Sequence, residues 1–127
     1  MSLSLRRIFI VVFVVLLFGC ASDLRRDSVE MSPLEPGKSR VIKVTADVSF
    51  RLSSGYSRTI AANSEWRSVG RISSGTVFQP VGRVFSIEGA HVHEAYLVLQ
   101  QDYLVGFYLP GEQKVSMLDP PVMVKTD

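Results

Sequence analysis

The two histidines in the segment HVHE, residues 91–94, are where metal or acid–base chemistry could concentrate. If this segment is a strand, His91 and His93 project from one face about 7 Å apart, a spacing that can place two imidazoles on one zinc ion. A structural zinc site needs four ligands and a catalytic one needs three. Glu94 would point to the opposite face, and Glu88 lies across a predicted turn. We therefore expect no metal and no cofactor, with His91 and His93 as weak candidate ligands.

Nucleophilic catalysis finds little support in the sequence. No serine lies in a G-x-S-x-G nucleophile elbow. Carboxylates gather in the C-terminal half, but paired carboxylates there are what a solvated surface would show. The one cysteine, Cys20, stands at the edge of an apolar run. We predict that the protein is not an enzyme.

The N-terminus has the pattern of an export signal. Arg6 and Arg7 precede an uninterrupted apolar run from Ile8 to Phe18, in which every residue is Ile, Phe, Val or Leu. This run is much shorter than the roughly 20 residues that a membrane-spanning helix needs. A basic start followed by a short apolar run is typical of a secretory signal peptide.

The residues Leu17-Phe18-Gly19-Cys20 resemble the lipobox of bacterial lipoproteins. The resemblance implies cleavage after Gly19, a diacylglycerol group on the Cys20 thiol and an N-acyl chain, such as palmitate, on its amino group. Two or three acyl chains hold a protein on a membrane stably, whereas one chain holds it only marginally. In these lipoproteins an aspartate directly after the cysteine favours the inner membrane. Here Ala21 follows, which implies the periplasmic face of the outer membrane, with the inner membrane as the alternative.

Charge and cysteine content narrow the function classes. All twelve acidic residues follow Cys20, and so do twelve of the fourteen basic ones, because only Arg6 and Arg7 precede it. The mature chain is therefore neutral, and no basic surface indicates nucleic-acid binding. An exported chain with one cysteine can form no internal disulfide, so the fold must be stabilised by its own apolar core.

The mature chain divides into a tether and one domain. Residues 20–39 mix both charge signs with serine, proline and glycine and show no apolar period, which predicts a lipidated, flexible tether. Such a chain would hold the domain roughly 20 to 25 Å from the lipid on average. Residues 40–127 are predicted to form a single all-β domain.

Residues 41–52 show the clearest pattern of the domain. Their even positions are all apolar, and their odd positions after Val41 are polar, which predicts a half-buried strand. A strand of this length should bend or bulge and so serve two sheets. Further strands are predicted over residues 66–72, 76–79, 84–87, 92–99, 103–109 and 114–117.

These short strands, separated by turn signals, predict a small antiparallel sandwich or partly closed barrel of about six to eight strands. The densest apolar region comprises Ala95–Leu99 and Tyr103–Leu109, which we expect to form a central hairpin covered on both faces. Gly106 should mark a bulge or the close approach of a neighbour, and Pro110 should end the second strand.

Trp66, Arg67 and Arg71 form a candidate interaction site, since an aromatic residue flanked by arginines suits recognition of a protein or an anionic glycan. The alternative is that Trp66 packs in the core. The sequence thus favours a membrane-anchored accessory subunit that binds an envelope protein within an envelope, secretion or conjugation assembly. The other hypothesis is a ligand-binding or enzyme-inhibiting lipoprotein, similar in size and class to those that block lysozyme.

Overall fold

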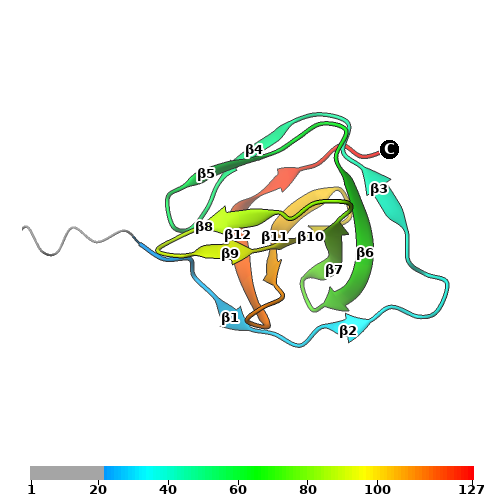
Figure 1. Cartoon of the computed structure of the whole chain (residues 1–127), viewed down its shortest axis with the longest axis horizontal. Helices are drawn as coiled ribbons and strands as arrows, with labels where there is room; N and C mark the ends of the chain where they lie inside the picture. Colours follow the sequence, from blue (N-terminus) through cyan, green and yellow to red (C-terminus); the bar gives the residue numbers. More distant parts are fainter. Residues whose placement is uncertain (1–21) are drawn as a thin grey trace, which may run out of the picture.

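Twelve β-strands form the secondary structure of the computed structural model, which describes residues 22–127 (Figure 1). They are β1 (Asp27–Ser28), β2 (Ser32–Pro33), β3 (Val41–Lys43), β4 (Val48–Arg51), β5 (Ser57–Ile60), β6 (Glu65–Ile72), β7 (Gly75–Pro80), β8 (Ser86–Glu88), β9 (Val92–Glu94), β10 (Tyr96–Gln100), β11 (Tyr103–Leu109) and β12 (Lys114–Met123). The predicted all-β class is confirmed. The strands outnumber the prediction because several have only two to four residues. This part of the chain holds no helix of the length and hydropathy that a membrane crossing requires.

One curled antiparallel sheet dominates the architecture. Its strand order is β1-β12-β11-β10-β7-β6-β2, and β3 also pairs with β6. The hairpins β4–β5 and β8–β9 form two further small sheets, which lie over one side of the large sheet (Figure 1). The result is a partly closed barrel in which the two hairpins cover the concave side.

Residues 41–52 serve two sheets, as their length predicted. β3 pairs with β6 in the large sheet, whereas β4 pairs with β5 in a separate hairpin. The break falls at residues 45–47, where Ala46 is exposed although it continues the apolar alternation. The remaining even positions of the segment are buried, so the alternation correctly identified the inward face.

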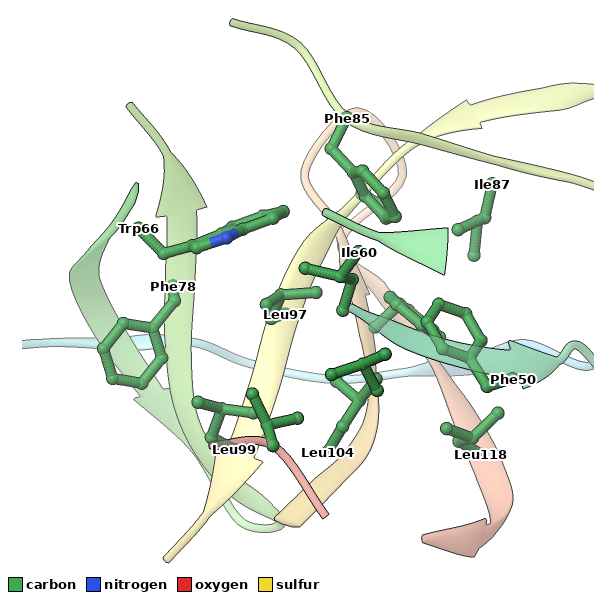
Figure 2. Packing of buried hydrophobic residues seen from close by; sticks show 14 of the residues in the cluster. Phe50, Ile60, Trp66, Phe78, Phe85, Ile87, Leu97, Leu99, Leu104 and Leu118 are labelled. Atoms are coloured by element: carbon green, nitrogen blue, oxygen red, sulfur yellow. The ribbon is translucent and has the colours of Figure 1, made fainter. Parts of the chain in front are cut away.

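The main core lies between the concave side of the sheet and the two hairpins (Figure 2). Phe107 of β11 packs against Phe50 of β4 at 5.2 Å between ring centroids, and against Phe85 at 6.3 Å. Phe85 in turn meets the edge of Trp66 at 5.4 Å. These aromatic contacts join both hairpins to the sheet, so the hairpins are integral to the core.

The strand pair β10–β11 is central and apolar on both faces, as predicted. The ladder shifts register between Leu104 and Gly106, which places a bulge beside the glycine. A Cβ atom at Gly106 would lie 2.7 Å from the carbonyl oxygen of Ser116 on β12. Gly106 therefore permits both a bulge and a close strand approach.

The segment predicted as a tether is described from residue 22 onward, and most of it lies on the domain. β1 pairs with β12 at one end of the sheet order, and β2 pairs with β6 at the other. Residues 22–34, here called the strap, therefore run across the molecule and join both ends of the sheet (Figure 1). Leu24, at the start of the strap, is buried in the main core.

The strap also covers a second, smaller apolar cluster on the convex side of the sheet. Val29 and Met31 pack against this outer cluster. Gly70 of β6 lacks a side chain where Met31 approaches, and a Cβ atom there would lie 2.8 Å from the carbonyl oxygen of Ser32. The buried members of the outer cluster are Ile72, Val77, Val98, Val105, Tyr108 and Val115.

Candidate functional site

Four ionisable side chains meet where the strap begins, and we call them the His93 cluster: Asp23, Arg26, His93 and Glu112. His93 Nδ1 lies 2.7 Å from Glu112 Oε2, and its Nε2 lies 3.4 Å from Asp23 Oδ1. Arg26 donates to Asp23 Oδ2 at 3.1 Å and also pairs with Glu112 Oε1. Each basic group thus bridges the same two carboxylates.

Three separate parts of the chain supply this cluster. Asp23 and Arg26 belong to the strap, His93 is the central residue of β9, and Glu112 lies in the turn between β11 and β12. Asp23 Oδ1 also accepts the backbone N–H of Ala90 at 3.2 Å. The cluster therefore fixes the first residues of the strap to two turns at one end of the domain.

The pKa of Asp23 is lowered from its ordinary value. The largest cause is the hydrogen bond that its carboxylate accepts from the backbone N–H of Leu24. Desolvation opposes this effect and raises the pKa, while the contacts with His93, Arg26 and the Ala90 N–H lower it further. Asp23 is consequently held in its charged form.

The pKa of Glu112 is also lowered, through a different balance of causes. Burial acts most strongly and raises the pKa, but the hydrogen bond and charge of His93 and those of Arg26 together outweigh it. When both ring nitrogens of His93 carry protons, the two carboxylates face one imidazolium and one guanidinium. The cluster is then electrically balanced.

This geometry suits a clamp better than a reactive centre. The two carboxylates lie on opposite nitrogens of the His93 ring, so they cannot converge with it on one ion. Among residues 22–127, no group of three histidine, cysteine, aspartate or glutamate side chains is arranged to hold a metal. Each ring nitrogen of His93 faces a carboxylate, so the ring is held between the strap and the turn before β12.

The structure separates the two candidate histidines. His93 has only 7% of its side chain exposed, whereas His91 is exposed in the turn before β9. Sequence analysis missed Asp23 and Glu112 as the partners of His93. Asp23 is 70 residues away in the chain, and Glu112 is 19 residues away, so no local spacing could have indicated either contact.

The candidate interaction residues of β6 are also divided. Trp66 is completely buried, and its indole N–H donates to Ser64 Oγ at 2.9 Å, so it is a core residue and not part of an accessible surface. Arg67 and Arg71 are both exposed, but the ladder with β7 shifts register between Ser68 and Gly70, so the two arginines project from opposite faces of the sheet. The predicted grouping of these three residues on one surface is therefore wrong, because Trp66 lies in the core and the two arginines lie on different faces.

The candidate lipidation residue Cys20 and the cleavage residue Gly19 lie outside the described residues. Comparison of the chain with known protein families, curated proteins and solved structures found no match.

Proposed function

We propose that the protein is a lipid-anchored envelope lipoprotein whose β domain is an accessory, protein-binding subunit and not an enzyme. The observation that carries this proposal is the sequence Leu17-Phe18-Gly19-Cys20 directly after a basic and apolar signal segment. Acyl chains on Cys20 would supply the membrane anchor. Ala21, next to the cysteine, supports placement on the periplasmic face of the outer membrane.

A basic strip on β3 and β6 is the surface that we propose for the partner. Arg67 is exposed on β6, and exposed Lys43 lies on the adjoining strand. Lys43 pairs with Glu65 and Val41 with Arg67 in the ladder, so these side chains share one face. Exposed basic side chains such as Lys43 and Arg67 suit an acidic surface on a partner protein.

Metabolic labelling tests the anchor. The full chain is produced in a bacterial host with a clickable palmitate analogue, beside the variant Cys20→Ala. The wild-type protein should take up label and sediment with membranes, and Cys20→Ala should do neither. An unlabelled wild-type protein, or label that persists in Cys20→Ala, would refute the lipid anchor.

Charge reversal tests the partner surface. The full chain is cross-linked in cells and purified from solubilised membranes. A cross-linked partner should be lost at least tenfold in Lys43→Glu/Arg67→Glu and retained in the control Arg51→Glu/Lys125→Glu, whose residues are also exposed. Equal recovery with both double variants would show that the basic strip does not bind the partner.

A further inference from the structure

We infer that the anchored protein stands directly on the bilayer, with the turn between β8 and β9 facing the lipid headgroups. This inference rests on the proposed lipid anchor at Cys20. It replaces the picture of a domain that moves freely at the end of a tether of about twenty residues. The evidence is the short length of chain between Cys20 and the His93 cluster.

Only three residue steps separate Cys20 from Asp23. A fully extended chain spans at most about 3.6 Å per residue, so the acylated residue lies within about 11 Å of Asp23. Asp23 is held by His93, Arg26 and the Ala90 N–H, and the next residue, Leu24, is buried in the main core. The domain cannot therefore move away from the membrane unless this end of the strap is released.

The surface around Asp23 then becomes the membrane-facing surface. Besides Ala90, the neighbouring turn holds Gly89, whose missing Cβ atom leaves room for Asp23 and for the backbone nitrogen of Leu24, 2.9 Å from where that Cβ would lie. Val92, directly after this turn, has 70% of its surface exposed. Small and apolar side chains at this position can enter the headgroup region without a large desolvation cost.

The charges around the turn between β8 and β9 also agree with a neutral lipid surface next to this turn. Exposed Glu88 and Glu94 flank the turn, and exposed Arg25 lies in the strap nearby, so no strong charge requires anionic lipid. The strand β3 lies at the opposite end of the longest axis of the molecule (Figure 1). Positions on β3 therefore serve as the membrane-distant reference.

Fluorescence quenching by lipid measures the orientation. The full acylated chain is purified from membranes as Val92→Cys or Lys43→Cys, labelled with an environment-sensitive dye, and reconstituted in phosphatidylcholine vesicles that carry a headgroup nitroxide. An acylated Cys20 has no free thiol, so only the introduced cysteine reacts. We expect at least threefold stronger quenching at position 92 than at position 43.

Two different failures are distinguishable. Equal quenching at both positions in a chain whose acylation is verified by mass would overturn the orientation and leave the anchor intact. A free thiol on Cys20, detected by mass and maleimide reaction, would overturn the anchor and this inference with it.

A clamp variant adds a second test. In the Val92→Cys background, His93→Gln should weaken the quenching at least twofold, because a weakened cluster lengthens the free chain. His91→Gln is the matched control, since His91 is exposed beside the same strand and makes none of the contacts of the His93 cluster. Unchanged quenching in His93→Gln would show that the cluster does not set the orientation.

Discussion

The two sides of the large sheet are covered in different ways. On the concave side, two hairpins contribute rings and branched side chains to one continuous core. On the convex side, the outer cluster is covered by a largely polar strap that contributes Val29 and Met31. The two hairpins are held on the concave side by apolar packing. The strap is held on the convex side by apolar packing together with the His93 cluster, and glycines leave room for it. We therefore expect the part of the strap after Leu24, residues 25–34, to detach without loss of the core.

The largest expected effect is on the concave side. Phe107→Ala would remove a buried ring that touches both Phe50 and Phe85 and should destabilise the domain by about 3 to 5 kcal/mol. Urea unfolding followed by the fluorescence of Trp66, the only tryptophan, measures this change. A loss below about 1 kcal/mol would mean that the hairpins do not depend on this contact.

Gly70→Ala should act on the convex side. The added methyl group would press on Met31 and on the Ser32 carbonyl, and overpacking of this kind costs about 1 to 3 kcal/mol. We expect faster tryptic cleavage after Arg25 and Arg26, with the urea midpoint less affected than by Phe107→Ala. Gly111→Ala is the control, because a Cβ atom there meets no heavy atom within 4 Å. Equal cleavage of both variants would argue against a tightly fitted strap.

The substitution His93→Gln should have a smaller effect. It removes a largely buried ring that hydrogen-bonds to Glu112 and faces Asp23, so we expect the urea midpoint to fall by less than in Gly70→Ala, because water can reach both carboxylates. His91→Gln should stay within about 0.5 kcal/mol of wild type. The same urea titration compares the two variants. Equal stability of His93→Gln and His91→Gln would show that the His93 cluster does not stabilise the fold.

Acid should have the smallest effect. The lowered pKa values of Asp23 and Glu112 mean that their stabilising contribution is complete above the ordinary carboxyl values, about 3.9 and 4.3, and is lost as the pH falls through the lowered values. NMR titration of the Leu24 and Ala90 amides, which donate to Asp23, should give a midpoint below the ordinary value. A midpoint at or above it would contradict the clamp.

Much of the inner architecture could be predicted from the sequence. The alternation of residues 41–52 indicated a strand shared by two sheets, and the double-sided apolar character of residues 95–109 indicated the centre of the large sheet. β5 was not predicted, because Ile60 is the only apolar residue among its four. A strand with regularly alternating buried residues can be recognised from its sequence. A short strand with one apolar residue shows no such alternation.

The strap and the His93 cluster could not be predicted in the same way. The apolar anchors of the strap, Leu24, Val29 and Met31, follow neither the period of a strand nor that of a helix, and they stand among polar residues. Their burial depends on tertiary contacts with distant strands. The charged partners of His93 likewise come from distant parts of the chain, so composition alone suggested a flexible tether.

Native-state hydrogen exchange over residues 22–34 tests most directly whether the chain beside the proposed anchor is part of the fold. The Val29 amide donates to the Gln113 carbonyl at 3.2 Å, and β1 and β2 pair with strands of the large sheet. The account predicts that these amides exchange at least about a hundredfold more slowly than in an unfolded chain. Exchange of the whole segment at the unfolded rate would contradict this prediction and would show that residues 22–34 form a flexible tether.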